Sequence, residues 1–427
     1  PTWPRRHQLH AWHAKLLTQS TDPAAKQNAV EVLNVALTSL ESTASTSDDS
    51  QTQKLMSTAT YLYDLAWLHH DLEQTELATR AFERINVNHP TSRFWADATF
   101  RLAQEHFARG RLAPATDLVQ QLFASGLPND QKTDEVRPSN GVPALSASFS
   151  GNSLEPKREN AAANGATNPI VSSEIMCQAL YLRAMIAVAE KDWATVGTWS
   201  QRLITEYPGH RLRWMSQFWA GEALFRQQKY GAAVERLIEV LPRTEERSEP
   251  WVAMTHLRLA QSLGHLDRWP EVLVIAEPAR RRFTDFSQAY ELDYLIGRAL
   301  ATEARFPQAR AGYQQVLDSP TGKNTETAAM AQWMIGETYF HQEQYALAAD
   351  AYHRTETLHR FPQWQAAALL QAGKCYEHMG RPQDAISAYR QLLKEHANCT
   401  LAKQAEERMA KLKPARPRES GNPTDAR

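Results

Sequence analysis

A small residue that recurs at a nearly constant interval limits the fold of this chain more than any other feature. Gly336 and Gly373 lie 37 residues apart, and the same residue types follow each of them at the same offsets. A repeat of this length is typical of stacked helical units that bury a shared core. The complete series is Ala66, Ala103, Ala184, Gly221, Ala260, Gly297, Gly336 and Gly373.

Each repeat has the pattern of two antiparallel helices. A second small residue follows the first, as Ala348 follows Gly336, and a large aromatic such as Tyr352 comes four residues later on the same helix face. Small side chains at both places let the two helices approach closely, and the aromatic ring fills the remaining space. A further aromatic is expected at the start of the second helix, at Trp193, Tyr230, Trp269, Phe306 and Tyr345.

The series also predicts how the chain is divided. One spacing is 81 residues instead of 37 or 39, because residues 127–170 form an insertion rich in Ser, Asn, Gly, Pro and Ala, which we expect to be disordered. Before the repeats, a polar loop is expected from Ser42 to Gln53. The predicted segments are a divergent helical pair with that loop (1–54), repeats (55–126), the insertion (127–170), repeats (171–398), a polar capping helix (399–413) and a disordered tail (414–427).

Charge and hydropathy exclude several classes of partner. The net charge is −1, with a pI of about 7.1, whereas nucleic acids and anionic membranes reward a clustered positive field. No aliphatic run approaches the ~20 residues that cross a bilayer, so no integral membrane span is expected. The chain begins at Pro1 without an initiator Met, which suggests a piece of a longer product.

The sequence predicts neither an enzyme nor a cofactor. It contains no Gly-rich phosphate loop, no GxSxG elbow and no HExxH motif. Two histidine groups invite a metal hypothesis, but neither has a carboxylate or Cys at ligand spacing to complete a site, so no metal is expected. These groups are His7, His10 and His13, and His69-His70-Asp71.

The spacing of two small residues, an aromatic and a proline resembles the tetratricopeptide repeat, over about eight units and most of the chain. Periods of 37 and 39 exceed the usual length of about 34 residues, which longer helices or turns would explain. The resemblance implies an all-α, right-handed superhelical solenoid whose first helices line a concave groove. Such a groove binds a protein or peptide segment.

A narrower resemblance lies in the phrases that precede the next first helix. Asn88-His89-Pro90-Thr91-Ser92, Glu206-Tyr207-Pro208-Gly209-His210 and His359-Arg360-Phe361-Pro362-Gln363 are similar to the tetratricopeptide lipoproteins of bacterial outer-membrane assembly and to the periplasmic coordinator of the Tol–Pal system. This likeness implies a docking scaffold in the cell envelope, within a membrane-associated complex.

Two positions on the first helix are candidates for partner binding. Three residues before the small residue, an aromatic recurs that the resemblance implies faces the groove; the alternative is core packing between repeats. These aromatics are Tyr63, Phe100, Tyr181, Phe218, Tyr294 and Trp333. One residue after the small residue lie candidate specificity contacts, for which the alternative is a solvated face. These are Glu222, Arg298, Glu337 and Lys374. No repeat has the Lys and Asn that bind chaperone C-terminal tails.

The sequence therefore predicts a non-catalytic interaction scaffold, with the bacterial periplasm or cell envelope as the leading location. A cytoplasmic adaptor built from the same repeats is one alternative, and the non-catalytic arm of a larger enzyme is another. A lipid-attachment Cys, a bare Met or a catalytic domain upstream of Pro1 would separate the three.

Overall fold

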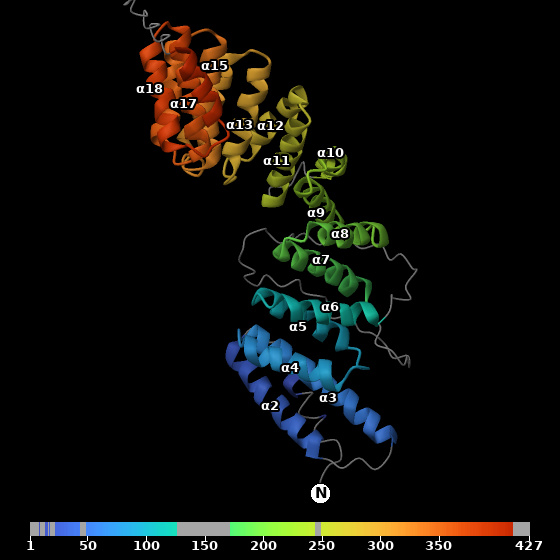
Figure 1. Cartoon of the computed structure of the whole chain (residues 1–427). Coiled ribbons are helices and arrows are strands. Elements are labelled where there is room, and N and C mark those ends of the chain that lie inside the picture. The colour runs from blue at the N-terminus through green and yellow to red at the C-terminus, as the bar shows by residue number, and fades with distance from the viewer. Residues whose placement is uncertain are drawn as a thin grey trace, which may run out of the picture. The chain divides into compact units, whose positions relative to one another are not determined.

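The computed structural model describes residues 8, 13–15, 17, 22–42, 48–125, 171–243 and 249–412, and within these ranges the chain is helical and contains no strand. The predicted all-α class is confirmed. The chain divides into two units, Pro1–Gln228 and Lys229–Arg427. Within each unit, the helices lie beside one another in chain order (Figure 1).

Unit 1 contains the helices up to residue 226. They are α2 (Pro23–Ser42), α3 (Asp48–Asp71), α4 (Thr75–Asn88), α5 (Trp95–Ala108), α6 (Leu112–Ala124), α7 (Ser173–Glu190), α8 (Trp193–Glu206) and α9 (Arg213–Arg226). The start of α2 follows the chemistry of helix caps, because Asp22 Oδ1 accepts a hydrogen bond from the backbone N–H of Ala24 at 3.0 Å.

Unit 2 contains the remaining helices and one short 3-10 turn. They are α10 (Tyr230–Ile238), η1 (Leu241–Arg243), α11 (Pro250–His265), α12 (Trp269–Arg282), α13 (Ala289–Thr302), α14 (Phe306–Asp318), α15 (Glu326–His341), α16 (Tyr345–Leu358), α17 (Pro362–His378), α18 (Pro382–Glu395) and α19 (Ala402–Leu412). The predicted entry aromatics are the first residues of their helices, and α19 lies where the capping helix is expected.

One predicted loop is partly wrong. The structure begins α3 at Asp48, so Asp48 to Gln53 are helical and do not belong to a polar loop. Their polar sequence carries no apolar stripe, but a helix already nucleated by its packed part extends outward at one hydrogen bond per residue. The predicted insertion (127–170) and tail (414–427) lie outside the described residues.

Three repeats of unit 2 pair a glycine with a tyrosine sixteen residues later. A Cβ added to Gly297 would lie 2.6 Å from Cε1 of Tyr313, and one added to Gly336 would lie 2.5 Å from Cε1 of Tyr352. The ring of Tyr389 occupies the same place against Gly373. The expected close approach of paired helices is therefore confirmed here, and its immediate cause is the buried ring, which occupies the space of the missing methyl group.

The turn between the two helices of a repeat has a uniform conformation. In every repeat, the residue seven places after the small residue adopts a left-handed conformation, with φ between 56° and 72°. Only two of these residues are glycines, although glycine is favoured there. The residues are Glu73, Gly110, Lys191, Gln228, Asp267, Ala304, Glu343 and Gly380.

Candidate protein-binding face

The first helices form a layer of their own within each unit. In unit 2, α11 packs on α13, α13 on α15 and α15 on α17, in addition to the contacts between neighbours in the chain. In unit 1, α5 packs on α7 in the same way. Residues on the exposed side of this layer therefore lie in rows that run from one repeat to the next. We call this surface the first-helix face.

Three of the six predicted aromatics are buried within the packing. Phe100 and Phe218 are each 2% exposed, and Tyr294 is 7% exposed. Burial removes them from any surface that a partner could reach without rearrangement, because the packed helices already surround the rings. The other three aromatics, Tyr63, Tyr181 and Trp333, are partly exposed. Contact of these residues with a partner stays a prediction.

Tyr63 joins two first helices of unit 1. Its hydroxyl donates to Asp97 Oδ2 of α5 at 2.7 Å, and its ring stacks on Phe94 with the centroids 4.4 Å apart. Arg101 completes the group, since its guanidinium lies 4.7 Å from the centroid of the Trp67 ring and its Nε lies 3.5 Å from Asp97 Oδ1. Burial and the neighbouring Asp97 carboxylate raise the pKa of Tyr63, so the hydroxyl stays protonated.

Trp333 lies in an aromatic group on unit 2. The centroid of its ring is 5.6 Å from that of Trp364 and 6.3 Å from that of Tyr352. Its indole Nε1 is buried and has no acceptor within the described part of the chain. An indole N–H is a donor only, so this atom has a hydrogen bond to gain from an acceptor.

The four predicted polar contacts differ in exposure. Glu222 is 3% exposed and accepts a hydrogen bond from Arg226 Nε at 2.7 Å, so it lies inside the packing. Arg298, Glu337 and Lys374 are partly exposed. Burial lowers the pKa of Lys374, and the nearby Arg408 guanidinium lowers it further.

Glu337 connects three helices. Its Oε1 accepts from the Tyr352 hydroxyl of α16 at 2.6 Å and from Gln371 Nε2 of α17 at 2.5 Å. The carboxylate raises the pKa of the already buried Tyr352 hydroxyl. Gln371 Oε1 is buried and lacks a donor among the described residues. The repeat pattern did not single out Gln371, because its type differs from repeat to repeat.

Glu377 and Arg408 extend this row to the end of the array, and the sequence prediction missed both. Glu377 accepts from the Tyr389 hydroxyl and, through Oε2, from Arg408 NH1 of α19 at 2.9 Å. Glu377 lies four residues after Gly373, one helical turn beyond the aligned small residue. Helical periodicity could therefore have placed it on the face, whereas Arg408 follows the last repeat and has no equivalent.

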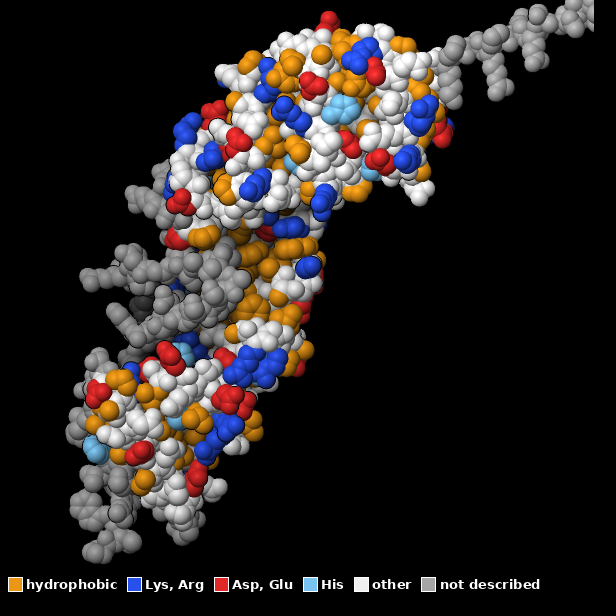
Figure 2. All heavy atoms as spheres, turned by 90° about the vertical axis from the view of Figure 1, so that its left-hand side faces the viewer, with side chains coloured by type: hydrophobic (Ala, Val, Ile, Leu, Met, Phe, Trp, Pro, Cys, Tyr) orange, Lys and Arg blue, Asp and Glu red, His pale blue; other side chains and the backbone are white. Residues whose placement is uncertain are grey.

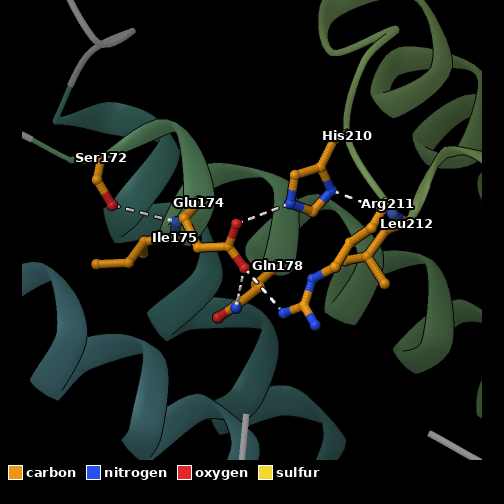
Figure 3. Close-up of polar contacts among 7 residues, drawn as sticks. All are labelled: Ser172, Glu174, Ile175, Gln178, His210, Arg211 and Leu212. Atoms are coloured by element: carbon orange, nitrogen blue, oxygen red, sulfur yellow. Dashed lines mark hydrogen bonds and ion pairs between the residues drawn. The ribbon is translucent and has the colours of Figure 1, made fainter. Parts of the chain in front are cut away.

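The phrase that contains His210 forms a polar joint between α7 and α9 (Figure 3). Glu174 Oε2 lies 2.9 Å from His210 Nε2, and Glu174 Oε1 accepts from Arg211 NH2 at 3.0 Å and from Gln178 Nε2 at 2.6 Å. The backbone N–H of Leu212 donates to His210 Nδ1 at 3.2 Å, so Nε2 is the donor to the carboxylate. The hydrogen bond from His210 is the main reason that the pKa of Glu174 is lowered to about 2.

A similar joint occurs in unit 2. Glu326, the first residue of α15, accepts from Gln363 Nε2 at 2.7 Å and from Trp364 Nε1 at 3.0 Å. An acidic side chain at the start of one first helix therefore holds the start of the next first helix. The helix N-terminus also favours the negative charge. These phrases have a structural role at the joints, whatever else they do.

Among the described residues, side chains that could bind a metal are dispersed, and two thiols are buried. Within 8–125, 171–243 and 249–412, apart from the gaps noted above, no three His, Cys, Asp or Glu side chains are grouped to bind a metal. His7 and His10 lie outside the described residues. Cys177 and Cys375 are buried, and burial raises the pKa of Cys375 to about 12, so its thiolate is not accessible.

Surface composition is mixed. On the face drawn in Figure 2, hydrophobic side chains gather beside Lys and Arg in one area, and charges of both signs are interspersed elsewhere. No helix among the described residues is long and apolar enough to cross a bilayer.

Comparison with known families identifies the repeats in unit 2. Residues 294–363 and 367–398 match models of the tetratricopeptide repeat. These residues are tetratricopeptide repeats. They include all three glycine–tyrosine pairs. No curated protein matches the chain.

Several solved structures are similar to this chain at low sequence identity. The apo form of RapI has a TM-score of 0.46 and 12% identity, covering 95% of this chain and 98% of that one. The apo form of the quorum sensor NprR from B. thuringiensis has a TM-score of 0.44 and 12% identity, covering 57% and 70%. The type IV pilus biogenesis factor PilW has a TM-score of 0.40 and 16% identity, covering 54% and 98%. At this level, none of them assigns a partner or function to this chain.

Proposed function

We propose that the chain is a non-catalytic scaffold that binds a segment of a partner protein along the first-helix face of unit 2. The observation that carries this proposal is the row of partly exposed side chains on the tetratricopeptide repeats: Arg298, Trp333, Glu337 and Lys374. An aromatic anchor among charges of both signs can bury an apolar side chain of the partner and set its register by charge.

Two buried polar atoms support binding of an extended segment. Trp333 Nε1 lacks an acceptor and Gln371 Oε1 lacks a donor among the described residues. The carbonyl and N–H of a peptide backbone would supply one of each. Because both atoms are buried, binding would require small side-chain rotations, which are common at interfaces.

We further propose that the scaffold works in a bacterial cell-envelope complex. This placement is supported by the resemblance of the joint phrases, including Glu206 to His210, to those of envelope tetratricopeptide proteins. Fractionation of the source cells with an antibody to the chain tests it. Recovery in the cytoplasmic fraction alone would instead favour the adaptor.

A photo-crosslinking amino acid tests the binding face. We expect a crosslinker at Lys374 to form adducts with a discrete partner protein in extracts of the source organism. A crosslinker at Leu358, which is 68% exposed on the second helix α16, provides the matched control and should form few adducts. Equal labelling from both positions would remove the first-helix face as the binding surface.

A further inference from the structure

The three glycine–tyrosine pairs of unit 2 differ in what their tyrosine hydroxyls contact. The Tyr352 hydroxyl donates to Glu337 Oε1 at 2.6 Å, and the Tyr389 hydroxyl donates to Glu377. The Tyr313 hydroxyl has no hydrogen-bond partner among the described residues, although the side chain is 0% exposed. Two of three equivalent rings therefore have a carboxylate from their own repeat, and the third has none.

Neither position that supplies these carboxylates is acidic in the first of the three repeats. Arg298, directly after Gly297, stands where the next repeat has Glu337, and Ala301 stands where the last repeat has Glu377. Arginine only donates, and its NH1 donates to the Tyr294 hydroxyl at 3.3 Å. Its guanidinium also lies 5.0 Å from the centroid of the Trp269 ring.

The acids nearest in the chain are engaged elsewhere. Glu291 Oε1 accepts from the Thr327 hydroxyl at 2.6 Å, and Asp293 Oδ1 accepts from Arg280 Nε at 2.8 Å. The place between Arg298, Tyr294 and Tyr313 thus collects a guanidinium and two hydroxyls without a carboxylate. A buried hydroxyl without a partner costs about 1–3 kcal/mol, and an acceptor would recover part of this free energy.

We infer that this place, the Arg298 site, receives an Asp or Glu side chain of the bound partner segment. The inference rests on the proposed function and specifies the chemistry of the partner. A carboxylate accepts two parallel hydrogen bonds from a guanidinium and still has lone pairs for the tyrosine hydroxyls. The partner would supply the group that Glu337 supplies within the next repeat.

The exposure of the side chains defines the order of contact. Arg298 is partly exposed, whereas Tyr313 is fully buried, so the arginine meets the carboxylate first. Contact with the Tyr313 hydroxyl would in addition require side-chain rotations, which are common at interfaces. The Glu337 carboxylate in the next repeat would repel the same acidic group there. The two repeats together therefore set the register of an acidic segment.

Stability measurements test the premise without any partner. We expect Arg298→Glu to raise the melting temperature of the full chain by about 2–4 °C, because it supplies an internal acceptor for the Tyr313 hydroxyl. Arg390→Glu, the same charge change on the exposed side of α18, should leave the melting temperature nearly unchanged. A melting temperature of Arg298→Glu no higher than that of Arg298→Gln, which loses the same contacts with Tyr294 and Trp269, would overturn the inference.

Peptide selection tests the ligand. Phage-displayed random dodecapeptides selected on the full chain should be enriched in Asp or Glu, and replacement of the acidic residue by Gln or Asn in a synthetic peptide should weaken binding at least tenfold. Arg298→Glu should weaken the acidic peptide by a similar factor, whereas Arg390→Glu should change its affinity less than threefold.

The remaining outcomes separate the two proposals. If no peptide is enriched, the proposed function fails and the inference fails with it. If peptides are enriched but carry no acidic residue and bind Arg298→Glu equally well, the scaffold stands and the inference falls. Displacement by 10 mM inorganic phosphate of a peptide that is insensitive to the Gln or Asn change would assign the site to phosphate and also overturn the inference.

Discussion

The helix pair α5–α6 of unit 1 and the pair α15–α16 of unit 2 pack their two helices together at the same place but with different residues. We call this contact within a pair the helix-pair joint. In the first, Ala103 stands at the small position and Val119 lies sixteen residues later, both 0% exposed. In the second, Gly336 stands there and Tyr352 fills the corresponding place. The combined volume of the two residues matters more than either type, because protein interiors are filled to a nearly constant density.

The larger ring also changes the chemistry of the joint. A valine needs no polar partner, whereas a buried tyrosine hydroxyl does, and unit 2 supplies Glu337 to Tyr352. The joints that contain Tyr352 and Tyr389 are therefore coupled to carboxylates of the first-helix face. Joints built from alanine and valine are not. A partner could act on the packing of unit 2 through this connection.

The largest expected effect comes from replacing Gly336 of unit 2 by alanine, the residue type that unit 1 has at the equivalent Ala103. Gly336→Ala places a methyl carbon 2.5 Å from the buried Tyr352 ring and should lower the free energy of unfolding by about 3 kcal/mol, measured by urea denaturation and circular dichroism. The reverse change, Ala103→Gly, should cost only about 1 kcal/mol. Adding Tyr352→Val to Gly336→Ala should recover part of the loss; no recovery would mean that the two joints are not equivalent.

Removal of the hydroxyl should change the free energy of unfolding differently for two tyrosines at equivalent positions. Tyr352→Phe removes a hydrogen bond to the Glu337 carboxylate and should cost about 1.5–3 kcal/mol. Tyr313→Phe removes a hydroxyl that has no partner among the described residues and should raise the free energy of unfolding by about 1 kcal/mol, because an unsatisfied buried hydroxyl is costly. Equal losses in the same urea titration would contradict the difference between the two repeats.

The left-handed turns allow a comparison that involves the backbone alone. An added Cβ at Gly380, at φ 67°, would meet no atom within 4 Å, so Gly380→Ala should cost about 1 kcal/mol through conformation only. Glu343→Gly, at the same place one repeat earlier, should stabilise the folded state by up to about 1 kcal/mol. Thermal melts of both variants check the opposite signs.

The smallest effect concerns acid stability in unit 1. The pKa of Glu174 is lowered to about 2 in the folded state, so the unfolded chain takes up this proton at higher pH. The stabilisation is complete above about pH 4.5, the ordinary pKa of a glutamate, and is lost as the pH falls towards 2. Because the side chain is 43% exposed, solvent screening should keep the effect below about 1 kcal/mol.

Glu174→Gln provides the control for this pH dependence. The variant should reduce the difference in stability between pH 5 and pH 3, whereas Glu41→Gln, a change at another exposed carboxylate of unit 1, should leave that difference intact. If both variants follow the wild type, the joint with His210 contributes nothing measurable to acid stability.

Much of the helical framework could be predicted from residue spacing. The entry aromatic Trp193 and the helix that ends at Leu412 both lie where the pattern places them. The beginning of α3 could not be predicted, because residues 48–53 have no apolar stripe and depend on the packed helix that follows. The shared left-handed turn could not be predicted either, because glycine occupies it only at Gly110 and Gly380.

The candidate site was predicted less completely. Spacing placed Phe100 and Trp333 at equivalent positions, but only packing decided that the first is buried and the second partly exposed. Exposure depends on the side chains of neighbouring repeats, which an internal repeat pattern does not weigh. The pairing of Glu337 with Tyr352 and Gln371 likewise joins three helices and has no counterpart in local spacing.

By itself, the sequence determined that the chain is a stack of helix pairs, because small residues at a constant interval permit close packing of helices in a regular array. The tertiary structure alone decided which hydroxyls and carboxylates meet. Hydrogen bonds require atoms within about 3 Å of one another, and such distances depend on side chains from separate helices, from 12 residues apart for Tyr389 and Glu377 to 34 for Tyr63 and Asp97. The Tyr313 hydroxyl near Arg298, which has no hydrogen-bond partner in the part of the chain that the structure describes, became visible only at that level.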